Sequence, residues 1–216
     1  MKGLLTKDFL LIRNQWTSAL IIVAAGIFMA FSMQPSACIA YLMMIGMMLA
    51  IGTTGYDEFD NGYRFLFTLP VSRKTYALEK YVFAAIIILG FMVIGVAGAA
   101  IVTVVKYSAA ALDILELLAE ALAMFLIVMV ALSFSLPSRL KYGSEKGRIA
   151  LYIIFGILTG IGLLLGYVLP AETVNAMELF VKSHATAVII SLTILAVAVI
   201  AGSVIISIRI MEKKEY

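Results

Sequence analysis

The strongest constraint on this chain is a series of six long apolar runs, each separated from the next by a short polar segment. About 20 consecutive apolar residues are enough for a helix to cross the hydrocarbon core of a bilayer. Hydrophobic residues make up 63% of the 216 residues and charged residues 13%, and the mean hydropathy is +1.09, well above the range of soluble proteins. We therefore predict an all-α membrane protein with one transmembrane domain over residues 1–216. Its spans are expected at about residues 17–33, 36–54, 81–105, 116–136, 149–169 and 184–208.

Lysine and arginine are divided unequally between the two sides of this predicted arrangement. The segment before the first span holds three, residues 55–80 and residues 138–148 hold four each, and the tail after the last span holds three. The opposite side holds only Lys106 and Lys182. Because positively charged segments stay on the cytoplasmic side of a membrane, both termini and both basic loops are predicted in the cytoplasm.

Several classes of function lack their sequence signals. The chain has no GxxxxGK[ST] phosphate-binding loop and no HExxH or other metal-ligand spacing. The only cysteine, Cys38, excludes an internal disulfide and is expected to be a small buried hydrophobe. The only histidine, His184, lies at a predicted membrane edge, so no base is expected near a nucleophile inside the spans. The formal charge of +3 comes from short basic clusters, which do not indicate nucleic-acid binding, and no cleaved signal peptide is predicted.

Residues 1–16 are predicted to form an amphipathic helix along the membrane surface. On a helical wheel one arc is apolar, and the other carries the basic and polar side chains. Asp8 falls inside the apolar arc, where a buried carboxylate would need a partner. An alternative interpretation places it as a charge near the lipid headgroups at the start of the helix.

Residues 55–80 are the longest polar interruption and separate the second and third spans. The segment combines charges of both signs, which cannot lie in hydrocarbon, with more aromatic side chains than a solvated linker needs. We predict a short helix over residues 56–67, a break at Leu69-Pro70 and a helix N-cap at Ser72. Aromatic anchors ringed by polar groups are typical of protein interfaces, so the segment is predicted to bind a soluble partner. An amphipathic loop lying on the headgroups is the alternative.

Three acidic residues share one helical face at the start of the fourth span: Asp113, Glu116 and Glu120. Carboxylates are favourable at the positive end of a helix dipole, which is the simplest interpretation. The alternative is an acidic outer vestibule that favours cationic cargo.

Pro137 is predicted to end the fourth span, and residues 138–148 are predicted to form a compact basic loop before the fifth. The third and fifth spans also contain small residues that let helices approach closely, within one chain or between copies. These are Gly90, Gly95 and Gly98 in the third span and the pairs Gly156/Gly160 and Gly162/Gly166 in the fifth.

Three stretches carry a family resemblance: the start MKGLLTKDFLLIRNQ, the run DEFDNGYRFLFTLPVSRKTYALEKY at residues 57–81, especially residues 68–74 and Lys80-Tyr81, and the basic stretch at residues 137–148. In this order they resemble the small six-span permeases of the ABC-2 type transporter family. The compact group that includes the permeases of phenol-soluble modulin exporters is especially similar. The first stretch, with Lys7 and Asp8, is similar to the family's elbow helix, and the second to its coupling segment.

The resemblance implies an exporter in a bacterial cytoplasmic membrane, built from two permeases and two separate ATP-binding subunits. ATP and Mg²⁺ would be held by those partners, and this chain would carry no cofactor and would not be an enzyme. The short outer loops favour small or membrane-embedded cargo, with amphipathic peptides first, antimicrobial peptides or drugs second and lipid-like molecules third. The residues implied to dock on the ATPase are Asp57, Glu58, Phe59, Asp60, Asn61, Gly62, Tyr63, Arg64, Phe65 and Phe67.

Two other functions remain open at this point. A non-transporting membrane protein, such as an immunity or sensor subunit that binds a toxic peptide, would need the same spans and no ATPase. An ion-coupled carrier would depend on ionisable groups, of which Glu116 and Glu120 are the nearest candidates.

Overall fold

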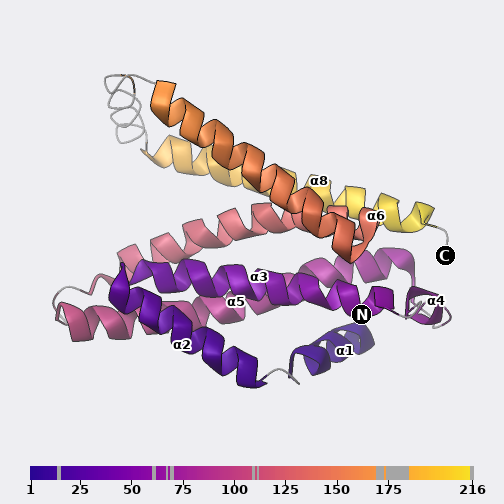
Figure 1. Ribbon diagram of the computed structural model, residues 1–216, viewed down its shortest axis with the longest axis horizontal. Coiled ribbons are helices and arrows are strands. Elements are labelled where there is room, and N and C mark those ends of the chain that lie inside the picture. The colour runs from indigo at the N-terminus through magenta and orange to yellow at the C-terminus, as the bar shows by residue number, and fades with distance from the viewer. Residues whose placement is uncertain are drawn as a thin grey trace.

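The computed structural model describes residues 1–13, 16–59, 62–66, 68, 71–108, 110, 112–168, 173 and 185–214, and within them the regular structure is helical, as predicted. In Figure 1 the long helices run lengthwise, and α1, α4 and both chain ends lie at the right-hand end of the molecule. The helices are α1 (Lys2–Arg13), α2 (Trp16–Ser32), α3 (Ser36–Glu58), α4 (Gly62–Leu66), α5 (Arg73–Lys106), α6 (Ile114–Val168) and α8 (Ala185–Lys213).

Four helical segments in the described part of the chain are long and apolar enough to cross a membrane. The bent pair α1 and α2 passes the same test together, with an angle of 71° at its break, which would bring the number to five. The six spans therefore stay a prediction. The four segments are Ser36–Glu58, Arg73–Lys106, Ile114–Ile149 and Ile189–Lys213.

Two predicted helix boundaries are confirmed. A tight turn at Gln34 joins α2 to α3, where the Ala37 N–H donates to the Gln34 carbonyl at 2.9 Å. Ser72 is the N-cap of α5, because its hydroxyl accepts from the Thr75 N–H at 3.1 Å. The predicted break at Leu69-Pro70 lies outside the described residues.

The closest helix packing joins α3 and α5. A Cβ at Gly95 would lie 2.9 Å from the Ile39 Cα, and one at Gly98 would lie 3.2 Å from the Cys38 sulfur, so the small residues of α5 let the two helices meet. Cys38 is fully buried in this contact, which confirms its role as a small hydrophobe. In contrast, a Cβ at Gly156 would meet open space, as would those at Gly160 and Gly166.

The prediction that Pro137 ends the fourth span and begins a loop is wrong. Pro137 lies inside α6, which is helical across residues 138–148 except for a kink at Gly143. A proline leaves the carbonyl four residues earlier without its helical donor. Here that carbonyl belongs to Ser133 and accepts from the Ser203 hydroxyl of α8 at 2.5 Å, so a neighbouring helix satisfies the backbone.

The predicted helix over residues 56–67 is also wrong in its extent. The second-span helix α3 continues to Glu58, and the separate short helix α4 covers only Gly62–Leu66. At the N-terminus, α1 ends at Arg13, and Trp16 begins α2 rather than closing the first helix. The last turn of α3 is polar and yet ordered, because its carboxylates bind other parts of the chain.

Candidate functional site

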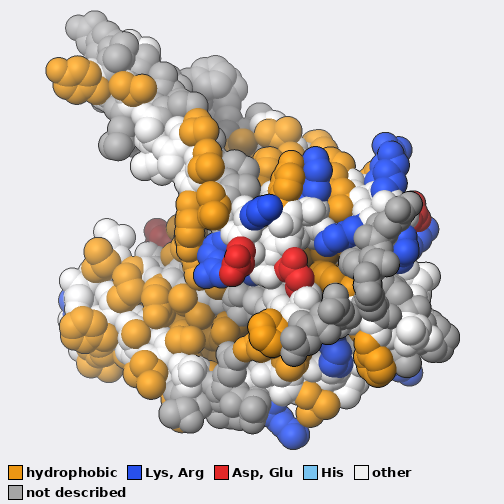
Figure 2. Space-filling view, turned by 45° about the vertical axis from the view of Figure 1, so that its right-hand side comes forward, with side chains coloured by type: hydrophobic (Ala, Val, Ile, Leu, Met, Phe, Trp, Pro, Cys, Tyr) orange, Lys and Arg blue, Asp and Glu red, His pale blue; other side chains and the backbone are white. Residues whose placement is uncertain are grey.

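Basic side chains gather at the end of the molecule where α1, α4 and the C-terminal end of α8 lie. Figure 2 turns this end toward the viewer and shows Lys and Arg side chains grouped on it, while hydrophobic side chains cover the neighbouring flank. We call it the basic end. The polar segment between α3 and α5, predicted to bind a partner, lies here (Figure 1).

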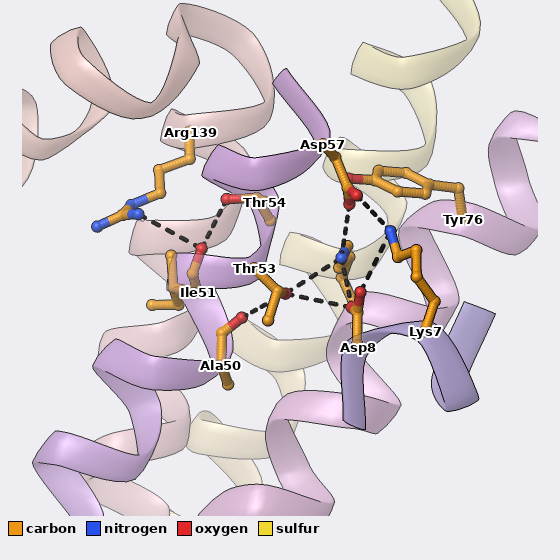
Figure 3. A network of polar contacts seen from close by, with 10 residues as sticks. Lys7, Asp8, Ala50, Ile51, Thr53, Thr54, Asp57, Tyr76 and Arg139 are labelled. Carbon is orange, nitrogen blue, oxygen red and sulfur yellow. Dashed lines mark hydrogen bonds and ion pairs between the residues drawn. The ribbon is translucent and has the colours of Figure 1, made fainter. Parts of the chain in front are cut away.

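A cluster of charges is buried at the basic end, between α1, α3 and α5 (Figure 3). The Lys80 ammonium lies 2.5 Å from Asp8 Oδ2 and 2.8 Å from Asp57 Oδ2. It also donates to the Thr53 hydroxyl at 3.1 Å, and this hydroxyl lies 3.2 Å from Asp8 Oδ2. Lys80 is 2% exposed and Asp8 is fully buried. These residues, together with Lys7, are called the charge cluster below.

Lys7 completes the charge cluster from the more exposed side of α1. Its ammonium pairs with Asp57 and lies 3.2 Å from Asp8 Oδ1. The 12 residues of α1 are too few to cross a bilayer alone. Burial disfavours the ammonium of Lys7, but the Asp57 and Asp8 carboxylates outweigh it and raise the pKa of Lys7 above its ordinary value.

The members of the charge cluster compensate one another. Two ammonium groups face two carboxylates, so the set is neutral, and hydrogen bonds satisfy most of the remaining polar atoms. The expectation that Asp8 needs a partner is thereby confirmed. The contacts of Asp8 with Lys80 and Thr53 could not be predicted, because residues of three different helices meet only in the folded chain.

An aromatic stack joins the charge cluster to α4. The Tyr76 hydroxyl donates to Asp57 Oδ2 at 2.9 Å, and the Tyr76 ring packs edge-on against Tyr63 of α4, with 5.8 Å between the centroids. On the other side of Tyr63, the Lys214 ammonium lies 5.0 Å from the ring centroid and donates to the Leu140 carbonyl at 2.9 Å. Burial lowers the pKa of Lys214. The short helix is therefore held between α5 and the end of α8.

A cavity of about 220 Å³ lies at the opposite end of the molecule. It is lined by the three acidic residues Asp113, Glu116 and Glu120, together with the α2–α3 turn and Thr103. Asp113 lies at the start of α6, where its Oδ1 accepts from the Leu115 N–H at 2.9 Å and the Glu116 N–H at 3.1 Å. Asp113 thus caps the helix, which agrees with the simplest interpretation of this group. The structure brings Glu116 and Glu120 to the same cavity, called the acidic pocket below.

A comparison with protein families identifies the family of the chain. The model of the ABC-2 family transporter proteins matches residues 3–212. The chain belongs to this family. No curated protein and no solved structure matches it.

Membership of the ABC-2 family makes this chain a membrane transporter component that is not itself catalytic. The permeases of this family normally work with an ATPase partner. Both statements agree with the apolar helices of the described residues and with the resemblance found in the sequence. The narrower likeness to the permeases of phenol-soluble modulin exporters is not confirmed.

The predicted docking residues of this ABC-2 family protein divide into inward and outward groups. Asp57 and Glu58 bind within the chain, and Tyr63 is buried. Phe59 and Phe65 point outward and are 73% and 72% exposed. Asp60, Asn61 and Phe67 lie outside the described residues, as does the side chain of Arg64.

Gly62 has a structural reason for its place at the start of α4. A Cβ there would lie 2.7 Å from the Asp57 carbonyl oxygen, so a larger residue would push α4 away from the end of α3.

Glu79 is a further buried group that sequence analysis did not single out. It is fully buried beside Lys80, and neither carboxylate oxygen has a hydrogen-bond partner among the described residues. A pattern of charges on α5 alone could not predict this, because the position is buried only in the folded chain.

Proposed function

We propose that this chain is the permease subunit of an ABC-2 exporter that uses ATP hydrolysed by a separate subunit. The observation that carries the proposal is the family match over residues 3–212, nearly the whole chain. The chain also lacks a phosphate-binding loop of its own. The energy for transport would therefore come from a docked partner that holds ATP and Mg²⁺.

The ATPase binds at the basic end, on the segment between α3 and α5. Phe59 and Phe65 are large exposed apolar side chains beside α4, next to a buried network of charges. Exposed aromatic groups within a polar rim are typical anchors of protein interfaces. In this arrangement the inward-facing Asp57 holds the docking segment in place through Tyr76, and neither Asp57 nor Glu58 contacts the ATPase.

The exporter works as a dimer of permeases in a bacterial cytoplasmic membrane, with the basic end in the cytoplasm and α1 as an elbow helix. The cytoplasmic position of the basic end is supported by the excess of Lys and Arg there. Self-association is supported by Gly156 and Gly160, at which a Cβ would meet no other described residue within 4 Å. Amphipathic peptides are the favoured cargo, since the walls of the bundle are apolar and the family likeness points the same way.

Coexpression with the neighbouring open reading frames, followed by purification in detergent, tests this function. We expect a stoichiometric ATP-binding subunit to copurify with the chain. The double variant Phe59→Glu/Phe65→Glu should lose that subunit, because carboxylates replace the apolar anchors, while the chain still inserts into the membrane.

Tyr142→Glu is the matched control, because Tyr142 is an exposed aromatic residue of α6 and lies outside the segment between α3 and α5. It should retain the ATP-binding subunit. If the chain always purifies alone, an immunity or sensor subunit becomes the better interpretation. If the double variant retains its ATPase and full transport, docking through these two aromatic residues is wrong.

A further inference from the structure

The C-terminal end of α3 rests directly on the bend of α6. The Ser144 N–H donates to Glu58 Oε2 at 2.6 Å, and the Ser144 hydroxyl bonds to the same oxygen. One turn earlier, a Cβ at Gly55 would lie 3.6 Å from the Ser144 side chain, which is ordinary van der Waals contact. Arg139 donates to the Ile51 carbonyl at 3.4 Å, so the last two turns of α3 contact both sides of the bend.

Glu58 acts as a helix cap supplied from another helix. The backbone of Gly143 has φ 83° and ψ 172°, so the helix is interrupted there and starts again at Ser144. The first N–H groups of a helix lack internal partners, and a negative charge beside them is favourable. Caps usually come from the residue just before the helix. This one comes from a residue 86 positions earlier in the chain.

Two glycines make room for this contact. A Cβ at Gly143 would lie 2.3 Å from Glu58 Oε1, and the positive φ of this residue also disfavours any side chain. A Cβ at Gly147 would lie 2.8 Å from the Arg139 Cα, so a glycine there lets the two halves of α6 approach each other. The bend therefore allows the Glu58 carboxylate to reach the backbone.

Residues 144–168 are called the arm below. In Figure 1 the arm extends away from α2, α3 and α5, with α8 beside it. Ile153, Ile157, Leu164 and Tyr167 along the arm are all exposed. The charged contact of Glu58 with Ser144 lies at the base of the arm, where a small displacement changes the direction of the whole helical segment.

We propose that Glu58 is a positioning residue that couples the docking segment to the arm. The inference rests on the proposed function, because α4 follows Glu58 closely and lies where the ATPase is proposed to bind. When the ATPase displaces α4, the end of α3 moves with it, and the Glu58 carboxylate carries this movement to Ser144. The arm then moves together with α3, although no covalent link joins the two directly.

Distance measurements on the chain alone test whether Glu58 holds the arm. Spin labels are placed at Met48→Cys on α3 and Ile157→Cys on the arm, both exposed positions, in a Cys38→Ala background in lipid nanodiscs. We expect one narrow distance distribution for the parent and a broadened one for Glu58→Ala. Glu58→Gln should lie between them, because its amide oxygen still accepts a hydrogen bond without the charge. An unchanged distribution in Glu58→Ala overturns the proposal.

Glu145→Gln is the matched control, because Glu145 is an exposed carboxylate on the same turn, and its distribution should stay narrow. If Glu58→Ala does not fold, Ser144→Ala takes its place. This variant removes one of the two bonds to the carboxylate and should broaden the distribution less. A parent-like distribution in Ser144→Ala would then overturn the proposal.

The complex with the copurified ATP-binding subunit tests the transmission of movement. ATP with orthovanadate should shift the distance between the labels in the parent, whereas Glu58→Ala should keep the subunit bound and lose the shift. A shift retained in Glu58→Ala, or absent from the parent complex, overturns the coupling. Failure of any ATP-binding subunit to copurify contradicts the proposed function instead, and the measurement on the chain alone still decides whether Glu58 positions the arm.

Discussion

The two ends of this molecule use charge in opposite ways. At the basic end, Lys80 and Asp8 are buried in a cluster in which each charge neutralises another. The opposite end, which carries the acidic pocket, is called the acidic end. There Glu116 and Glu120 are exposed at the rim of the open pocket, and water can solvate them. The comparison indicates that charge at the basic end holds three helices together, whereas charge at the acidic end is available to solvent or a ligand.

The largest effect is expected from Lys80→Met, which removes the central cation of the charge cluster. Asp8 would be left fully buried with Lys7 and the Thr53 hydroxyl as its described partners, and Asp57 would lose one of its two described cations. Removing one partner of a buried ion pair costs about 3–5 kcal/mol. We expect a loss of this size in the free energy of unfolding, measured by denaturation with SDS in mixed micelles.

The control is Lys106→Met at the other end, where the ammonium is exposed and donates to the Phe31 and Met33 carbonyls. Its cost should stay within about 0.5 kcal/mol, as for most surface substitutions. The double variant Asp8→Asn/Lys80→Met should be more stable than Lys80→Met alone, because no unpaired carboxylate remains at position 8. Equal losses for Lys80→Met and Lys106→Met would abolish the contrast between the two ends.

The features that could be predicted from the sequence are those that depend on one short stretch of chain. The apolar runs of about 20 residues predicted the long helices, and Ser72 was recognisable as a cap because its partner is three residues away. Asp8 could be identified as needing a partner, since it interrupts the apolar face of its own helix. Each of these signals depends on residues within a few turns of one another.

The features that were missed depend on residues distant in sequence. Pro137 does not end the helix, because the hydroxyl of Ser203 on α8 satisfies the freed carbonyl of Ser133. The contact between Glu58 and Ser144, 86 positions apart, could not be predicted from spacing. For the same reason no pattern on α5 could identify Lys80 as the centre of the charge cluster.

A moderate effect is expected from Asp113→Ala at the acidic end. Its carboxylate accepts from the Leu115 and Glu116 N–H groups, and the loss of such an N-cap costs about 1 kcal/mol. Asp113→Asn should restore most of the stability, because the amide oxygen can accept the same bonds. The free energy of unfolding measured under the conditions used for Lys80→Met gives the comparison. A loss as large as that of Lys80→Met would show that this end is also held together by charge.

The smallest effect on stability, within about 0.5 kcal/mol, is expected from Glu116→Gln/Glu120→Gln, because both side chains are exposed. The same variant separates two mechanisms of transport. An exporter driven by a docked ATPase does not need a proton or sodium ion at these carboxylates, so export of a labelled amphipathic cationic peptide should continue. An ion-coupled carrier would lose transport entirely while its stability stayed unchanged. A partial loss confined to cationic peptides, with neutral amphipathic peptides unaffected, would instead assign the acidic pocket to cargo selection, since only the attraction to positive charge has been removed.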